Sequence, residues 1–177
     1  MINNFYSYIL EEDDSDVISY SFLTSNRSVY YVYFDPYEYV RYTDNYPHLL
    51  ESGFAFGFQR IIKGNGPWIS DLKIGETISR IVIDFIKEHG ADVVLLYHCD
   101  YSDKKQRGRV KIFNDWYECS AMKQSFIKKK IAVSIVNKNG GVIDYYMGYL
   151  TSKNNSLSQN VEDEFSLFAE NLASNKP

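Results

Sequence analysis

Residues 93–97 read Val-Val-Leu-Leu-Tyr, and this run decides the fold. A short run that is apolar at every position predicts a central strand that is covered on both faces of a sheet. Before the run, apolar residues recur at the spacing of one helix face: Ile74, Ile78, Ile81, Val82 and Phe85. They predict an amphipathic helix that ends at Gly90, because glycine tolerates the left-handed backbone of a helix C-terminal cap.

Three strands are expected before that helix. Residues 16–24 alternate between apolar and polar, and residues 29–34 are β-branched or aromatic at every position, so together they predict a hairpin. Residues 54–58 alternate phenylalanine with Ala55 and Gly57. This period of two predicts a third strand whose small residues face something close.

Two helices and a hairpin are expected after the central strand. Residues 104–118 carry apolar side chains at helical spacing. Residues 126–136 and 142–151 alternate on either side of an Asn-Gly-Gly turn at 139–141, which predicts a hairpin. A C-terminal helix is predicted by a last set of apolar residues at helical spacing: Val161, Phe165, Phe168 and Leu172.

The predicted order of elements is therefore β-β-β-α-β-α-β-β-α. Hairpins interrupted by helices are typical of an α+β domain, so we expect a mostly antiparallel sheet with helices packed mainly on one face. A length of 177 residues without a long linker predicts a single domain. We place this domain at residues 16–173, after an acidic N-terminal segment (1–15) and before a short polar tail (174–177).

Charge is distributed unevenly along the chain. The net charge is −4, yet residues 101–130 carry 9 basic and 3 acidic side chains, whereas residues 1–60 carry 3 basic and 9 acidic ones. The chain as a whole is therefore not a general polyanion binder. The basic segment is either a solvated surface that balances the acidic part of the same fold or a binding site for anions.

The sequence predicts a cytoplasmic protein. Its N-terminus lacks the basic and apolar regions of a secretory signal, and no apolar run approaches the roughly 20 residues of a membrane helix. We therefore expect reduced thiols at Cys99 and Cys119 and no contact with a membrane. The histidines and cysteines have no recognisable metal-ligand spacing and a glycine-rich phosphate loop is missing, so we expect no metal and no cofactor.

A polar cluster directly follows the central strand. Residues 97–117 read Tyr-His-Cys-Asp-Tyr-Ser-Asp-Lys-Lys-Gln-Arg-Gly-Arg-Val-Lys-Ile-Phe-Asn-Asp-Trp-Tyr. Together with the Tyr- and Phe-rich hairpin before it, this segment resembles a family of small proteins found mainly in Bacteroidota, the domain of unknown function DUF6169. The resemblance rests on Cys99-Asp100, Asp103, Gln106-Arg107, Arg109, Phe113 and Trp116. It spans residues 17–150 and implies a bacterial cytoplasmic setting, but no activity, because the family has none assigned.

Two interpretations of the polar cluster remain open. Arg107 and Arg109 carry the forked donors that suit carboxylates and phosphates. Asp100 and Asp103 are close enough in sequence to orient these arginines, so we favour an internal network of salt bridges and caps that fixes the second helix on the sheet. The alternative is a site for a nucleotide, a nucleic acid or another anion, with these candidates: Asp100, Asp103, Gln106, Arg107, Arg109 and Lys111. Further lysines would extend that basic surface: Lys104, Lys105, Lys128, Lys129 and Lys130.

Catalysis is a third hypothesis, for a hydrolase or nuclease that uses His98 and Asp100. Two carboxylates from one loop are too few for a two-metal nuclease, which argues against it. His98 and Cys99 are neighbours on a strand, so we expect their side chains to point to opposite faces of the sheet. A single histidine on a strand is more often a structural residue than a catalytic one.

Tyrosines interleaved with acidic residues follow the first hairpin. The candidates for a protein interface are Tyr37, Tyr39, Tyr42 and Tyr46. Tyrosine combines contact area with a polar tip, and the acidic neighbours would repel phosphate. Our leading hypothesis is therefore a non-enzymatic module that binds a partner protein or a second copy of itself through this stretch and an exposed edge strand. Its size and presumed lineage suit an accessory system such as phage defence or toxin–antitoxin pairing, although the tyrosines are equally compatible with core and rim positions of a small sheet.

Overall fold

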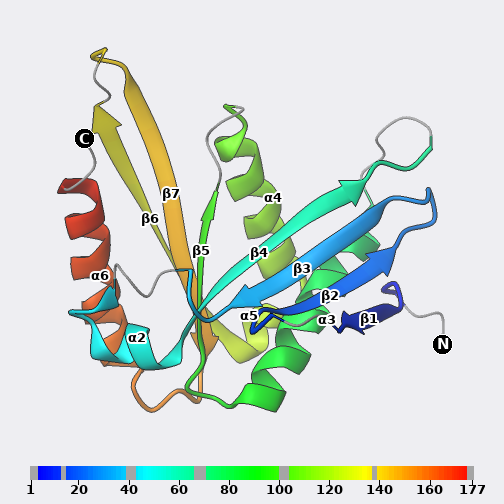
Figure 1. The fold of residues 1–177 in the computed structure, drawn as a ribbon, viewed down its shortest axis with the longest axis horizontal. Helices are drawn as coiled ribbons and strands as arrows, with labels where there is room; N and C mark the ends of the chain where they lie inside the picture. Colours follow the sequence, from blue (N-terminus) through cyan, green and yellow to red (C-terminus); the bar gives the residue numbers. More distant parts are fainter. Residues whose placement is uncertain are drawn as a thin grey trace.

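The computed structural model describes residues 4–12, 15–38, 43–65, 71–99, 104–136 and 139–174. The strands in these ranges are β1 (Tyr8–Glu11), β2 (Ile18–Leu23), β3 (Val29–Asp35), β4 (Gly53–Ile62), β5 (Val94–Cys99), β6 (Phe126–Val136) and β7 (Val142–Ser152). They form one sheet in the order β1-β2-β3-β4-β5-β7-β6 (Figure 1). Every neighbouring pair is antiparallel except β4 and β5, so the predicted α+β class and mostly antiparallel sheet are confirmed.

The helices in the same ranges are α2 (Pro47–Ser52), α3 (Leu72–His89), α4 (Gln106–Cys119), α5 (Met122–Ser125) and α6 (Ser158–Ser174). Each strand and helix that the sequence predicted is present. The structure adds β1, α2 and α5, which are too short to show a clear period. Helix α2 has proline in its first turn, where the fixed backbone angle of proline suits a helix start.

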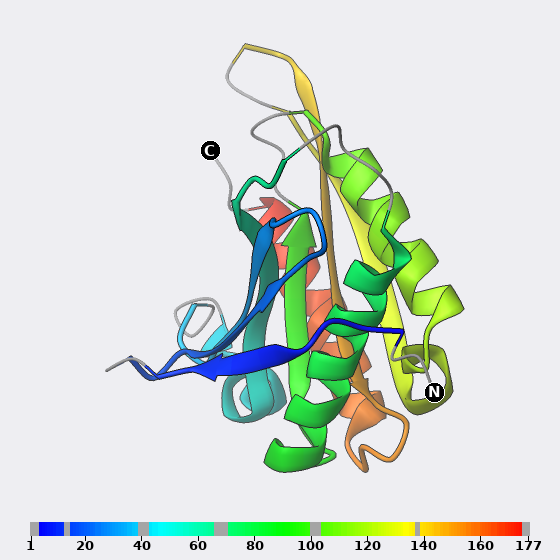
Figure 2. The same ribbon diagram turned by 90° about the vertical axis from the view of Figure 1, so that its right-hand side faces the viewer.

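Helices α3, α4 and α5 cover one face of the sheet, as Figure 2 shows for α3 and α4. Their apolar sides bury side chains from β2, β3, β4 and β5 in the first of two core clusters. The centre of this cluster is Phe85 of α3, which stacks on Phe34 of β3 with 3.7 Å between the ring centroids. Both side chains are fully buried.

Helices α2 and α6 lie on the opposite face and build the second core cluster. Phe165 of α6 packs edge-on against Tyr149 of β7, with 4.9 Å between the ring centroids. The expectation of helices mainly on one face therefore holds for three of the five described helices. It misses α2 and α6, because a periodic pattern identifies the buried side of a helix and not the sheet face on which that side rests.

Strand β5 contributes to both clusters, as its unbroken apolar sequence predicted. Leu95 and Tyr97 belong to the first cluster, whereas Val94 and Leu96 belong to the second. The second cluster includes no described residue of β1, β2 or β3. On these strands the face away from α3 consequently keeps apolar side chains in contact with solvent, such as Ile9.

The parallel pair β4 and β5 is short. The two strands are connected through α3, as a parallel pair requires, and they pair only between Gly53–Ala55 and Val94–Leu96. Both strands continue beyond this register, β4 to Ile62 and β5 to Cys99. Figure 1 shows that they separate toward their ends like the arms of a fork.

Candidate functional site

A pocket of about 480 Å³ lies where β4 and β5 separate. We call it the fork pocket. Its described lining residues are Tyr30, Tyr33, Phe56, Gly57, Phe58, Gln59, Arg60, Tyr97, His98, Cys99, Arg109 and Phe113. They come from β3, β4, β5 and α4, so the pocket exists only when the sheet and the helix are assembled.

The edge position of the fork pocket explains how neighbouring residues of one strand both line it. Cys99 is 8% exposed and lies on the face covered by α4, whereas His98 is exposed. Their side chains thus differ in exposure as expected for neighbours on a strand. Beyond Leu96, the described β5 has no ladder partner on its β4 side, so side chains from both faces meet at the open edge.

Helix α4 closes one side of the fork pocket. Arg109 and Phe113 are four residues apart and so lie on one helix face. Phe113 packs edge-on against Tyr97 at 4.8 Å and lies 6.0 Å from Phe56, measured between ring centroids. Phe113 is buried, and Arg109 is half-buried at the same wall. Phe113 and the Arg109 guanidinium are therefore held by the same helix.

Two glycines allow rings to lie directly against backbone at the fork pocket. A Cβ atom on Gly57 would come within 2.4 Å of the Tyr33 ring, and one on Gly148 would come within 2.5 Å of the Tyr97 hydroxyl oxygen. Both distances are far shorter than a van der Waals contact. The sequence predicted that the small residues of β4 face something close, and at Gly57 this is the Tyr33 ring.

The described lining of the fork pocket contains two arginines, Arg60 and Arg109, and the histidine His98, and it contains no carboxylate. Burial raises the pKa of the Cys99 thiol, while the nearby positive charges of Arg109 and Lys130 act in the opposite direction. The site thus combines partial burial with two guanidinium groups.

Two carboxylates, Asp35 and Glu38, lie near Tyr33 of the fork pocket without lining it, and their charges add to the effect of burial, which raises the pKa of Tyr33. Burial and the charge of Asp35 raise the pKa of Glu38, and His98 acts to lower it. Glu38 is therefore close enough to the exposed His98 for the two to interact electrostatically.

Several cations of the basic segment make contacts within the protein. Arg107 donates to Asp144 of β7 at 2.7 Å, which lowers the pKa of that carboxyl, and Lys129 pairs with Glu162 of α6 at 2.6 Å. Lys128 lies over the Tyr117 ring at 4.5 Å, and burial lowers its pKa. These contacts attach α4 and α6 to the hairpin of β6 and β7.

The other anion-site candidates differ in their surroundings. Arg109 lines the fork pocket, whereas Lys111 is exposed on α4 and does not. The side-chain oxygen of Gln106 is buried and has no hydrogen-bond partner within the described part of the chain. Asp100 and Asp103 lie outside the described residues.

The candidate interface tyrosines do not share one environment. Tyr37 is 62% exposed, whereas Tyr46 is only 6% exposed. Tyr46 packs edge-on against Phe168 and accepts a hydrogen bond from Asn171, so it stabilises the contact with α6. Tyr39 and Tyr42 lie outside the described residues.

Sequence reasoning did not select the residues that β3 and β4 bring to the fork pocket. Tyr33 and Arg60 lie on strands whose pattern predicted structure alone, and their approach to Arg109 depends on where β4 and β5 separate. The alternation of phenylalanine with small residues in β4 was the one available signal. It indicated a close contact and could not identify its partner.

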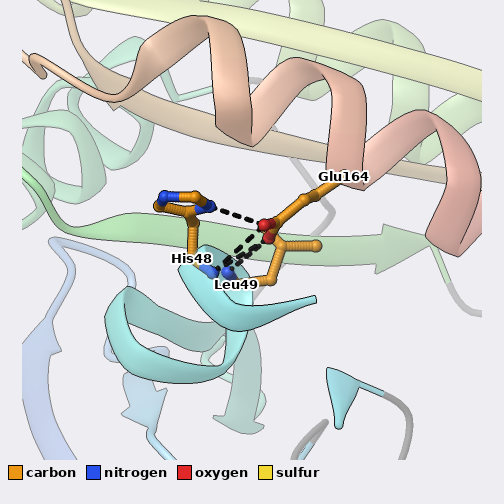
Figure 3. Close-up of polar contacts among 3 residues, drawn as sticks. All are labelled: His48, Leu49 and Glu164. Atoms are coloured by element: carbon orange, nitrogen blue, oxygen red, sulfur yellow. Dashed lines mark hydrogen bonds and ion pairs between the residues drawn. The ribbon is translucent and has the colours of Figure 1, made fainter. Parts of the chain in front are cut away.

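A second polar cluster joins α2 to α6 (Figure 3). One carboxylate, that of Glu164, accepts hydrogen bonds from the backbone amides of His48 and Leu49 at 3.0 Å. It also contacts His48 Nδ1 at 2.5 Å. Negative charge is favourable at the start of a helix, where amide groups lack helical partners, so we assign this cluster a structural role.

The remaining chemistry of the described residues is limited. They contain no group of three or more His, Cys, Asp or Glu side chains that could hold a metal ion. Cys99 and Cys119 are free thiols, the first buried and the second exposed. In the described part, no helix is sufficiently long and apolar to span a membrane.

Comparison with known proteins identifies a family. A family model described as a family of unknown function (DUF6169) matches residues 70–166. The predicted resemblance is therefore confirmed, over a range that begins and ends later than the expected 17–150. The matched range starts just before α3 and extends into α6. No curated protein and no solved structure matches the chain.

Proposed function

The chain belongs to the family of unknown function DUF6169, and for this member we propose that the fork pocket binds a small anionic molecule. The observation that carries the proposal is that the parallel strands β4 and β5 separate after three paired residues. β4 and β5 separate after Ala55 and Leu96, and the space between them is lined by two arginines, a histidine and aromatic rings. Ligands of open α/β sheets commonly bind in such a crevice at the carboxyl ends of parallel strands.

The size and chemistry of the fork pocket support this proposal. Its volume of about 480 Å³ falls in the range of roughly 300–1,000 Å³ that is typical of small-molecule sites. Such sites are mostly apolar and carry a few convergent polar groups, as this one does. Guanidinium groups are suited to phosphates and carboxylates, since they offer two parallel donors to a pair of oxygens. Arg60 and Arg109 are the groups that we expect to bind the anion.

The position of Cys99 provides a direct test. Purified protein is treated with N-ethylmaleimide, and alkylation of each cysteine is followed by mass spectrometry with and without inorganic phosphate, pyrophosphate, ribose 5-phosphate, the ribonucleoside 5′-monophosphates or citrate. We expect at least one anion to slow alkylation of Cys99 several-fold. Cys119 is exposed and lies outside the described pocket lining, so its rate should not change and serves as an internal control.

Arginine variants assign the protection to the fork pocket. Arg60→Gln and Arg109→Gln should each weaken binding by about 10- to 100-fold, because a hydrogen bond to a charged group contributes about 1.5–3 kcal/mol. Arg109→Lys should keep part of the affinity. Arg80→Gln removes the same charge from a half-exposed position on α3 and should have no effect. Protection of Cys99 by none of the anions, or equal protection in both arginine variants, would refute the proposal.

Protein recognition is a second candidate function, supported by a different surface. Ile9, Leu23 and Ile61 are exposed on β1, β2 and β4, and Tyr37 is exposed just after β3. Exposed apolar side chains that gather in a patch are typical of interaction sites. Ile61→Ser with Leu23→Ser should then abolish any concentration-dependent increase in mass measured by light scattering. A protein that stays monomeric at high concentration and retains no partner from a host lysate would count against this function.

A further inference from the structure

The fork pocket has an aromatic part that the binding of a simple anion does not need. Half of its described lining residues carry aromatic rings: Tyr30, Tyr33, Phe56, Phe58, Tyr97 and Phe113. Phe56, Tyr97 and Phe113 are buried and form a closed floor. The other three are only half-buried, so each keeps ring surface that a ligand can cover.

Tyr33 is the ring with the most unusual placement. It lies directly opposite Gly57 in the ladder between β3 and β4, and its ring rests on the backbone of that glycine. On its other side it packs beside Tyr31, with 6.2 Å between the ring centroids. The ring is therefore fixed before any ligand arrives, and a fixed ring loses little conformational freedom when a planar group stacks on it.

Arg60 lies on the opposite face of the sheet from Tyr33, and the pocket joins the two faces at the edge of β4 that has no described ladder partner beyond Ala55. Arg60 follows Phe58 by two residues on β4, so both side chains point to the same face of the sheet. Arg109 reaches the pocket from α4. A ligand that uses both the Tyr33 ring and these arginines must carry a planar ring and, within the length of one pocket, an anionic group that accepts paired hydrogen bonds.

We infer that the fork pocket takes a mononucleotide-like molecule, with a planar base against Tyr33 and, across the open edge of β4, a phosphate at Arg60 and Arg109. This inference rests on the proposed function, and it adds the ring to the anion. Stacking on aromatic side chains tolerates every base, because each base has a π-face. A single-stranded nucleic acid has the same chemistry, but a pocket of about 480 Å³ favours one nucleotide over a chain of them.

Calorimetric titration separates the ring from the phosphate. The probes are the four ribonucleoside 5′-monophosphates, ribose 5-phosphate, which lacks the base, and the four nucleosides, which lack the phosphate. We expect at least one nucleotide to bind 10-fold or more tightly than both ribose 5-phosphate and its own nucleoside. Equal binding of that nucleotide and ribose 5-phosphate would overturn the inference and leave the proposed function standing, whereas binding of no probe, with Cys99 unprotected by any anion, would overturn both.

Variants of Tyr33 test whether the base of the nucleotide stacks on its ring. Tyr33→Ala should reduce nucleotide affinity 10-fold or more without changing the affinity for ribose 5-phosphate, and Tyr33→Phe should retain it. Tyr37→Ala removes an exposed tyrosine just outside the sheet and is the matched control. Circular dichroism and the melting temperature verify that each variant is folded. Unchanged nucleotide affinity in Tyr33→Ala would contradict the inference.

A final comparison tests for a polymer. If a single-stranded oligonucleotide binds far more tightly than any mononucleotide, and Lys111→Gln weakens it as strongly as Arg109→Gln, the site is a nucleic-acid surface and the inference is wrong. Lys111 is exposed on α4 and lies outside the described lining of the fork pocket. For a mononucleotide, Lys111→Gln should leave the affinity unchanged.

Discussion

The two parts of the sheet differ in how many of their faces are covered. Strands β1 to β4 pack on α3 with one face, whereas β5, β7 and β6 lie between α4 and α5 on one side and α2 and α6 on the other. The sequences follow this difference, since β4 alternates large and small residues and β5 is apolar at nearly every position. A strand buried on both faces needs apolar side chains in both directions, whereas a strand buried on one face needs them at every second residue.

The start of the family match lies close to the boundary between these two parts of the sheet. It begins at residue 70, so α3 and the doubly covered strands fall inside it and β1 to β4 fall outside. The fork pocket lies between the two parts. Tyr33 and Arg60 come from the first, whereas Tyr97, Arg109 and Phe113 come from the second. The proposed site therefore requires both parts.

The largest expected loss of unfolding free energy follows from removing a core ring in either part of the sheet. Phe85→Ala and Phe165→Ala each remove a fully buried ring, which costs about 3–5 kcal/mol of unfolding free energy. Urea denaturation followed by circular dichroism measures both. If the parts fold as one cooperative unit, each variant shifts one common transition. Two separate transitions would show that the parts unfold independently. Leu167→Ala, at an exposed position of α6, is the control and should change little.

A smaller loss of unfolding free energy is expected where Glu164 of α6 holds α2, on the part of the sheet that is covered on both faces. Glu164→Gln weakens the hydrogen bonds to the amides of His48 and Leu49 and should cost about 1–3 kcal/mol. Hydrogen exchange of the Leu49 amide should accelerate. Glu162→Gln, in the same helix but in an exposed pair with Lys129, should leave that exchange rate unchanged. Equal exchange in both variants would show that Glu164 does not fix α2.

The unfolding free energy at alkaline pH should depend on one tyrosine from each part of the sheet. Burial, together with a hydrogen bond to Asp84, raises the pKa of Tyr8 to about 12, and burial raises the pKa of Tyr149 to about 12. The unfolded chain releases these protons near pH 10, so the stability they contribute is complete below pH 10 and falls as the pH rises toward 12. Tyr8→Phe and Tyr149→Phe should each flatten the decline of unfolding free energy with pH. An unchanged slope in either variant would contradict the raised pKa of that tyrosine.

The smallest effect is expected at the surface ion pair between α4 and β7. Arg107 is exposed and Asp144 is half-buried, and a pair with one partner in solvent contributes little. Arg107→Gln should leave the melting temperature unchanged within error. A clear decrease would show that the internal network of the basic segment stabilises the fold. Protection of Cys99 in the same variant then reports whether the pair also positions α4 at the fork pocket.

The sequence alone determined the class of the fold and the type of nearly every long element, because hydrophobic period and turn chemistry are local properties. The unbroken run at residues 93–97 identified the central strand. Alternation in β4 even indicated a close contact, which Gly57 makes with Tyr33. The short elements β1 and α2 escaped prediction, since four to six residues carry too little pattern.

Only the tertiary structure decided where the strands separate and which side chains meet there. Arg60 and Arg109 are 49 positions apart, and no local pattern relates them. Their common pocket depends on the three-residue register of β4 with β5 and on the seating of α4 across the fork. Tyr46 illustrates the same limit, because an acidic, tyrosine-rich stretch reads as surface until α6 packs over it. Residue type and spacing fix local geometry, whereas a site made from distant segments is fixed by how the buried faces of those segments pack together.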